Sequence, residues 1–406
     1  MRKYIVKNKF EFLLVLIGTL LLLFYYFAFE IYNQHLIYPD TESYISAADS
    51  LYFHARGHNL RPLVLAAIHG FPFLFTSTKQ ELIQFNILTN YFCFILSGIL
   101  IYKILSSYLN NKLAFWISCI HFLALGIISN VFHMLSETIF IFFILLSFYF
   151  LNQYQIKKKY SFLILFLSTL SLSILIRPGI QILALFFIFL FRKEIYFNLK
   201  NNWNFTLMLC WSIICIQMAG IKYQFGNFTI SYVDAITYYS YLGSKAELLK
   251  NNTPYNQLDN PRTLYIYSLD YPDQKKIATL DLKEQIQNNT FNLIKAYIDD
   301  IYHNTIDESM AIKDLNNNKS SLYLIGIWIS RFQNIFFTII GVCLSLYYLF
   351  INNTRNKLIS ISGIYILYIV MTSGMSCAQG DRFHIVFYPI SLLLIAFYLK
   401  KKKVIS

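Results

Sequence analysis

Long apolar runs recur along this chain and constrain its fold more than any other feature. An α-helix needs about 20 apolar residues to cross the roughly 30 Å of hydrocarbon in a bilayer, because each residue advances it by about 1.5 Å. Only 14% of the residues are charged, whereas soluble domains typically carry about 25%. Too few polar residues remain to cover the apolar runs in water. The sequence therefore predicts an all-α polytopic membrane protein.

Ten of these runs resemble transmembrane helices. They occupy residues 10–32, 82–105, 112–129, 134–152, 160–176, 179–192, 204–222, 325–350, 357–374 and 383–400. No small-residue cleavage site follows the first run, so we expect an uncleaved span. The chain then divides into an N-terminal transmembrane module (1–222), an extracytoplasmic subdomain (223–324) and C-terminal transmembrane helices (325–406).

The positions of the basic residues predict the orientation. With a cytoplasmic N-terminus, the inner segments hold Arg2, Lys3, Lys7, Lys9, Lys103, Lys112, Lys157, Lys158, Lys159, Arg192, Lys193, Lys200, Arg355, Lys357 and Lys400 to Lys403. Most carboxylates then lie on the other side, and Glu11 and Glu194 are the exceptions. Because cytoplasmic loops are enriched in Lys and Arg, we expect both termini in the cytoplasm and the working surface outside. The net charge of +13 follows this topology and does not indicate nucleic acid.

Two outer segments are too long to be simple connections. The first loop, residues 33–81, contains an apolar stretch at 61–75 that is too short to cross and is expected to form an interfacial or re-entrant helix. The late loop, residues 223–324, is rich in Tyr, Asn and Asp and includes a helical pattern at 281–314. It is the candidate for a small, mostly helical subdomain.

The cysteines and histidines predict no metal centre. The six cysteines match neither a disulfide framework nor a zinc pattern. The first loop holds His35, His54, His58 and His69, and His54 and His58 are one helical turn apart, but no third ligand has a matching spacing. We expect no cofactor. A divalent ion on Asp40, Glu42 and Glu137 stays open.

Carboxylates suited to chemistry come at the outer ends of separate spans. Asp40 and Glu42 follow the first span, and either could act as a general base on a hydroxyl group. The alternative is a solvated turn in which Asp40 caps the next helix. Glu137 opens the fourth span, where a carboxylate close to hydrocarbon needs a partner or water.

Cationic residues come at the same membrane level. Arg177 lies between two apolar runs, and Arg382 and His384 open the last span. A guanidinium offers five donors in a geometry that suits phosphate. Arg331, near the start of the eighth run, is a further phosphate contact or a side chain that snorkels to the head groups.

In their order, these residues resemble the membrane glycosyltransferases of the GT-C fold, the group that includes protein O-mannosyltransferases and bacterial aminoarabinose transferases. The matching segments are Asp40, Glu42 and Tyr44 after the first span, Arg61-Pro62, Ser136-Glu137, Arg177-Pro178, and Gly380-Asp381-Arg382-Phe383 leading to Tyr388-Pro389. The chain departs from the family in two respects. Its soluble part lies between late spans and not at the C-terminus, and Thr41 splits the acidic pair.

The resemblance implies a GT-C-like bundle and a glycosyltransferase of the bacterial inner membrane. Such an enzyme transfers a sugar from a polyprenyl-phosphate donor to a cell-envelope glycan, lipid or protein acceptor on the extracytoplasmic face, with inversion. The family's catalytic carboxylate maps onto Asp40, with Glu42 as the alternative bearer. The remaining roles fall on Arg177, Arg382, His384 and Arg331 for the donor phosphate, and on Tyr44, Arg61 and Glu137 as supporting residues.

Other functions stay open from the residues alone. A flippase or transporter for lipid-linked saccharides also needs many spans and basic residues, but such proteins often show inverted repeats and broken helices near the midplane, which we do not find. A polysaccharide polymerase or ligase is a closer rival, since the chain partly has the outer Arg and His residues and the long late loop expected there. A scaffold without catalytic activity is the third alternative.

Overall fold

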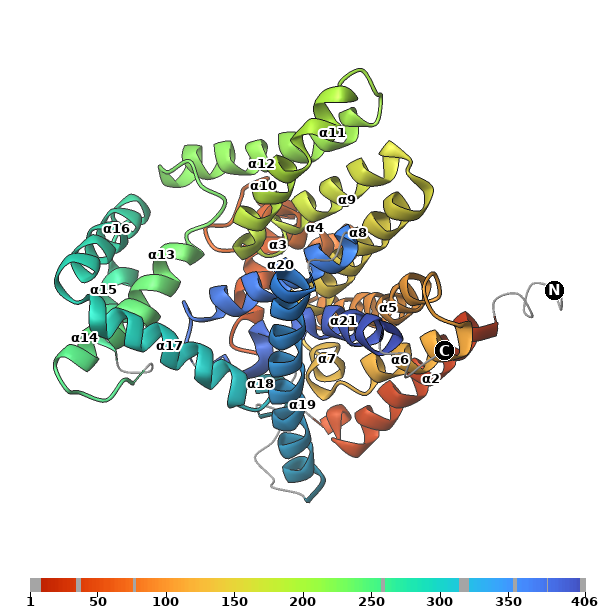
Figure 1. Ribbon diagram of the computed structural model, residues 1–406. Helices are drawn as coiled ribbons and strands as arrows, with labels where there is room; N and C mark the ends of the chain where they lie inside the picture. The colour runs from red at the N-terminus through yellow and green to blue at the C-terminus, as the bar shows by residue number, and fades with distance from the viewer. Residues whose placement is uncertain are drawn as a thin grey trace.

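The computed structural model describes residues 9–33, 38–75, 78–256, 260–313, 321–352, 356–377 and 379–401. Of the residues discussed above, Arg2, Lys3, Lys7, His35, Arg355, Lys402 and Lys403 lie outside these ranges. The regular structure of the described residues is helical throughout, with no strand (Figure 1). This confirms the all-α class.

Six of the described helical segments are long and apolar enough to cross a membrane. They are α2 (Lys9–Ala28), α5 (Lys79–Leu105), α8 (Glu137–Lys157), α12 (Asn204–Phe225), α19 (Ser321–Leu346) with its π-helical extension η5 (Tyr347–Ile351), and the segment η6 (Gly380–Phe383), η7 (Ile385–Phe387) and α21 (Tyr388–Lys401). Large apolar side chains such as Phe24, Phe205 and Phe332 are exposed on these helices. Water would penalise such surfaces, so they indicate a membrane-embedded protein.

Four of the ten expected spans are shorter than predicted or interrupted. The run at 112–129 forms α6 (Asn111–Phe122) and α7 (Leu125–Asn130), because the backbone is extended at Ala124. The other three are α9 (Tyr160–Ser173), η3 (Pro178–Ile180) with α10 (Gln181–Leu190), and α20 (Lys357–Ser373). Pro178 contributes to the break after α9, since a residue before proline is disfavoured in a helix. The total of ten spans therefore stays a prediction.

Helix α8 lies at the centre of the bundle and connects its two chemically different ends. It packs against α5 and α9, and α21 packs against α19 and α20. Glu137 begins α8 among arginines, whereas Lys157 ends it about 30 Å away. At that second end Lys103 pairs with Glu11 at 3.6 Å and Lys357 with Glu194 at 2.8 Å. The fold thus separates the basic residues assigned to the inner side from the charged residues assigned to the outer side.

The first loop and the late loop fold mainly as short helices. The short η1 (Ile31–Asn33) leads into the first loop, which contains α3 (Thr41–His54), α4 (Leu63–Gly70) and η2 (Phe71–Leu74), and α4 with η2 occupies the stretch predicted to be interfacial. The late loop contains α13 (Val233–Thr237), π-helical η4 (Tyr238–Gly243), α14 (Ser244–Lys250), α15 (Pro261–Ser268), α16 (Tyr271–Asn288), α17 (Thr290–Ile306) and α18 (Met310–Lys313). Helices α13 to α17 gather on one side of the bundle around a small core of their own (Figure 1). The short α11 (Arg192–Phe197) joins α10 to α12.

Candidate functional site

Asp40 lies between two guanidinium groups at the start of α3. Its Oδ1 is 2.9 Å from Arg61 Nη2, and its Oδ2 is 2.7 Å from Arg382 Nη1. The carboxylate makes no capping hydrogen bond to α3, so it interacts with the arginines and not with the amides at the helix end. Burial alone would raise the pKa of Asp40, but the positive charges of Arg382 and Arg61 outweigh it and hold the pKa at about 2. Asp40 is therefore ionised at neutral pH.

Glu137, the first residue of α8, is the second carboxylate of the site. Only 1% of its side chain is exposed. Arg382 Nε donates to its Oε1 at 2.5 Å, and Arg177 Nη1 lies 3.7 Å from the same oxygen. A charge this deeply buried is strongly destabilising unless it is paired. Arg382 therefore forms ion pairs with both carboxylates, which fix its position, and Arg61 and Arg177 supply the remaining positive charge.

Arg61 is fixed by side chains from the beginning of α3. Its Nε donates to Ser43 Oγ at 2.8 Å, and its Nη1 donates to Tyr44 Oη at 3.2 Å. The guanidinium also lies 4.1 Å from the centroid of the Tyr44 ring, within the range of a cation–π contact. The predicted supporting residues Tyr44 and Arg61 thus act together to orient Asp40.

Arg177 is the least saturated cation of the site. It is extended, as expected of a residue before proline, and Phe383 lies 4.8 Å from its guanidinium. A backbone hydrogen bond of 3.1 Å from Leu65 to Leu175 holds this segment against α4. Its Nη1 is buried and has no hydrogen-bond partner among the described residues, since 3.7 Å to Glu137 is too long. Arg177 can therefore still donate to a ligand.

These five residues, Asp40, Arg61, Glu137, Arg177 and Arg382, form what we call the arginine-carboxylate cluster. They come from five separate segments that the bundle brings to one end. Three guanidiniums and two carboxylates leave one net positive charge. Asp40 is 31% exposed, so the cluster is reached from its side, while Glu137 closes the bottom.

Three of the predicted site residues lie elsewhere. Glu42 is exposed and forms an ion pair with Lys79. His384 is buried between Thr338 and Ser373, whose hydroxyl oxygens are 3.0 and 3.1 Å from its ring nitrogens. Arg331 Nε donates to the carbonyl of Ile306 at 2.7 Å, and its Nη2 lies 3.9 Å from both Asp307 and Glu308. The structure therefore does not bring them into the arginine-carboxylate cluster.

Other side chains lie within electrostatic range of the cluster without having been assigned to it from the sequence. His69 on α4 is fully buried, and the centroids of the His69 and Tyr44 rings lie 5.2 Å apart with their planes nearly perpendicular. Tyr241 and Tyr267 come from the late loop. Burial and nearby charges that include Asp40 raise the pKa of Tyr241 to about 12, and burial raises the pKa of Tyr267, which also senses Arg61 and Asp40. The only signal in the sequence was the abundance of tyrosine in the late loop.

The described part of the chain contains no group of three or more His, Cys, Asp and Glu side chains arranged for a metal ion. His54 pairs with Asp49 at 3.6 Å, whereas His58 Nδ1 accepts hydrogen bonds from the backbone amides of Leu60 and Arg61. The sequence leaves open a divalent ion on Asp40, Glu42 and Glu137, and Glu42 lies beside Lys79, apart from the other two carboxylates.

Two comparisons with known proteins find no match. No protein-family model matches the chain, and no curated protein matches it.

Proposed function

We propose that this protein is a membrane glycosyltransferase that uses a polyprenyl-phosphate-linked sugar and acts on the extracytoplasmic face. The acceptor is a cell-envelope glycan, lipid or protein. The observation that carries the proposal is the arginine-carboxylate cluster, in which an ionised Asp40 lies beside guanidiniums that can hold phosphate.

The charge of the cluster fits a donor with one phosphate. A sugar joined to a polyprenyl phosphate is a phosphodiester with a single negative charge, which would balance the one net positive charge of the cluster. Arg177 Nη1 supplies a donor that has no partner among the described residues. Hydrogen bonds between guanidinium and phosphate are among the strong ones in proteins, because both groups are charged.

The reaction is a single displacement. Asp40 takes the proton of the acceptor hydroxyl, and the acceptor oxygen forms a bond to the anomeric carbon. The bond from that carbon to the phosphate oxygen breaks, and its electron pair leaves with the polyprenyl phosphate, so the configuration inverts. Arg177 and Arg382 stabilise the second negative charge that develops on the phosphate. No strong general acid is needed, because phosphate is a good leaving group.

Asp40 becomes a better base when the donor binds. In the unliganded site, Arg61 and Arg382 lower the pKa of Asp40 to about 2, which makes it a weak proton acceptor. A phosphate that takes hydrogen bonds from Arg382 reduces the positive charge acting on Asp40, and the pKa of Asp40 rises. The base is then activated only when a donor is present.

The surrounding segments suit the two substrates. Phe71, Leu74 and Phe75 are exposed at the end of the first loop and form an apolar surface for the polyprenyl chain. On the late loop, Tyr241 and Tyr267 lie within electrostatic range of Asp40 and offer aromatic rings to an acceptor. The late loop is thus proposed to hold the acceptor and the first loop to guide the lipid.

The proposal includes a membrane arrangement beyond the six long helices. The shorter helices α6 with α7, α9, α10 and α20 also lie in the bilayer and complete a GT-C-like bundle of about ten spans. Both termini face the cytoplasm of a bacterium, and the arginine-carboxylate cluster faces outward. What supports this is that the basic residues and the cluster lie at opposite ends of α8.

The test is sugar transfer by purified protein in liposomes, with radiolabelled polyprenyl phosphate sugars and an envelope extract as acceptor. We expect wild type to move label and Asp40→Asn not to. The matched control is Glu42→Gln, which removes an exposed carboxylate two positions away that is held by Lys79.

The same assay separates the alternatives. If intact lipid-linked sugar crosses the bilayer and no label moves to an acceptor, the protein is a flippase and the proposal fails. If label enters long chains of repeating units, the polymerase or ligase function replaces it.

A further inference from the structure

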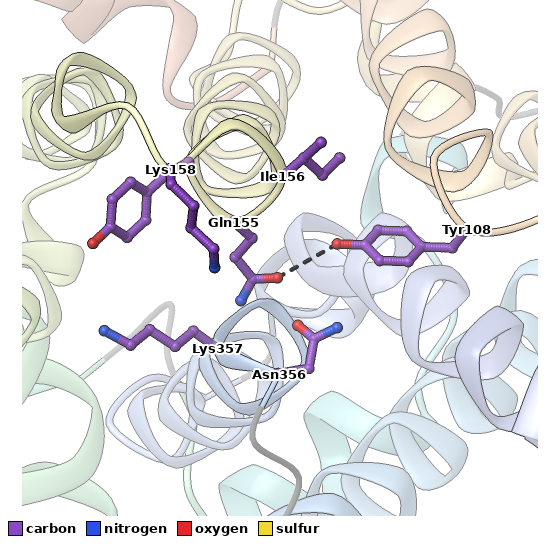
Figure 2. Close-up of a pocket in the computed structure, with 7 residues that line it drawn as sticks. Tyr108, Gln155, Ile156, Lys158, Asn356 and Lys357 are labelled. Carbon is purple, nitrogen blue, oxygen red and sulfur yellow. Dashed lines mark hydrogen bonds between the residues drawn. The ribbon is translucent and has the colours of Figure 1, made fainter.

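A cavity of about 390 Å³ opens at the end of the bundle opposite the arginine-carboxylate cluster. It is lined by Tyr108, Tyr154, Gln155, Ile156, Lys158, Asn356 and Lys357 (Figure 2). The residues come from the end of α8, the turn after α5 and the start of α20. A volume of this size accommodates a small ligand or a head group.

Lys158 supplies the charge that such a ligand would meet first. It follows the last residue of α8 in a left-handed conformation with φ of 54°, which turns its side chain away from the path of the helix. Lys158 and Gln155 both line the cavity, and Figure 2 shows the Lys158 side chain extending from the end of α8 on the same side as Gln155. The side chain is exposed, so the charge faces water and not a buried carboxylate.

Lys357 is held differently. Its Nζ is 2.8 Å from Glu194 Oε1 and 4.7 Å from the centroid of the Phe191 ring. In Figure 2 this ammonium extends away from Asn356. Glu194 thus already balances Lys357, and Lys158 is the cation of the cavity that can accept an anion.

The polar wall between these lysines is already hydrogen-bonded. Tyr108 Oη lies 3.4 Å from the Gln155 amide (Figure 2). Asn356 Oδ1 accepts hydrogen bonds from the Leu358 and Ile359 amides at the start of α20. Because the amide side chains and the first amides of α20 have partners, a ligand would be bound chiefly by the lysine ammonium and not by the helix end.

The residues around the cavity favour a lipid over a small soluble anion as its ligand. Ile156 lines the cavity and is half exposed, which joins the cavity to the apolar outer surface of the bundle. Lys157 lies 5.0 Å from the Phe162 ring, and Lys400 donates to the carbonyl of Tyr108, so further positive charge surrounds the opening. Basic pockets between membrane helices bind anionic head groups, with about 1 kcal/mol for each Lys near the surface.

We infer that this cavity is a binding site for the phosphate head group of an anionic phospholipid, with Lys158 as its principal contact and the acyl chains beside Ile156. The site lies about 30 Å from the arginine-carboxylate cluster, the length of α8, and so belongs to the other leaflet. It does not depend on the proposed transferase activity.

The experiment measures binding of phosphatidylglycerol to the purified full-length protein in detergent by native mass spectrometry, with phosphatidylcholine as the reference lipid. We expect wild type to prefer phosphatidylglycerol, and Lys158→Ala to raise its apparent dissociation constant roughly fivefold. Lys158→Arg keeps the charge and should keep the affinity. Lys159→Ala removes a neighbouring positive charge that does not line the cavity, and it should bind like wild type.

Two outcomes overturn the inference. Equal weakening by Lys158→Ala and Lys159→Ala would mean that general surface charge, and not the cavity, attracts the lipid. Full displacement of phosphatidylglycerol by inorganic phosphate at equal concentration would mean that the ligand is a soluble anion. Thermal unfolding in phosphatidylcholine alone shows whether each variant is folded before its binding is compared.

Discussion

Arg382 Nη1 lies 2.7 Å from Asp40 Oδ2, so a side chain at the start of the last long helical segment neutralises a carboxylate that follows the first. The same guanidinium donates through Nε to the buried Glu137. One residue therefore joins the first loop, the central helix α8 and the C-terminal part of the bundle.

Replacing Arg382 is expected to destabilise the fold strongly. In Arg382→Gln, Glu137 keeps only the more distant Arg177 in the cluster, and an uncompensated buried charge typically costs about 3–5 kcal/mol. The thermal midpoint in detergent micelles measures the loss. The control is Arg192→Gln, since Arg192 is an exposed arginine that donates to the Phe189 carbonyl at 3.1 Å. Equal midpoints for the two variants would contradict this account of Arg382.

The level of the cluster residues in the membrane could be predicted from the sequence, but not which of them meet. Counting spans and basic residues places Asp40, Glu137, Arg177 and Arg382 at one end, and the structure brings them together. The partner of each depends on packing between segments far apart in the chain. For example, the hydrogen bond from Leu65 to Leu175 holds α4 against the Arg177 segment, and no local pattern indicates it.

Two residues grouped with the cluster lie away from it for one physical reason. Glu42 comes two positions after Asp40, and His384 comes two positions after Arg382. Residues two apart in a helical turn point to roughly opposite sides, so neighbours in sequence are not neighbours in the site. Glu42 thus reaches Lys79, and His384 reaches Thr338. Helical geometry alone therefore predicts that Glu42 points away from Asp40 and that His384 points away from Arg382.

Arg177 is expected to affect catalysis more than stability. Its Nη1 has no hydrogen-bond partner among the described residues, so Arg177→Gln breaks few contacts in the unliganded protein. Loss of a charged hydrogen bond to the donor phosphate, worth about 1.5–3 kcal/mol, should lower kcat/KM for the donor by roughly 10- to 100-fold. Arg177→Lys should recover part of the lost kcat/KM because it restores the positive charge. The recovery should be incomplete because an ammonium lacks the planar geometry of the guanidinium. Unchanged kcat/KM in Arg177→Gln would remove Arg177 from the phosphate site.

Asp40 is expected to make the fold sensitive to acid. The pKa of Asp40 is about 2 in the folded protein, below its ordinary value of 3.8, so the carboxylate stabilises the fold above pH 4. That contribution, about 2 kcal/mol, is lost as the pH falls from about 4 through 2. Thermal midpoints measured from pH 6 to pH 2 should fall less steeply in Asp40→Asn than in wild type. Asp49→Asn, which changes an exposed carboxylate of α3, should keep the slope of wild type.

His384 is expected to contribute to the stability of the fold and not to phosphate binding. Its two ring nitrogens lie 3.0 and 3.1 Å from the hydroxyl oxygens of Thr338 and Ser373, so it joins α19 and α20 to the last helical segment. His384→Ala leaves both hydroxyls without this partner and a cavity beside them, which should lower the free energy of unfolding by about 2–4 kcal/mol.

In His384→Ala, the rate of sugar transfer per folded molecule should nevertheless stay within about twofold of wild type, since the imidazole does not contact Arg382 or Asp40. His54→Ala, an exposed histidine of the first loop, is the control for both measurements. A fall in kcat/KM for the donor as large as that of Arg177→Gln would assign His384 to the phosphate site after all. It would also mean that the segment at residues 380–387 changes its conformation when the donor binds.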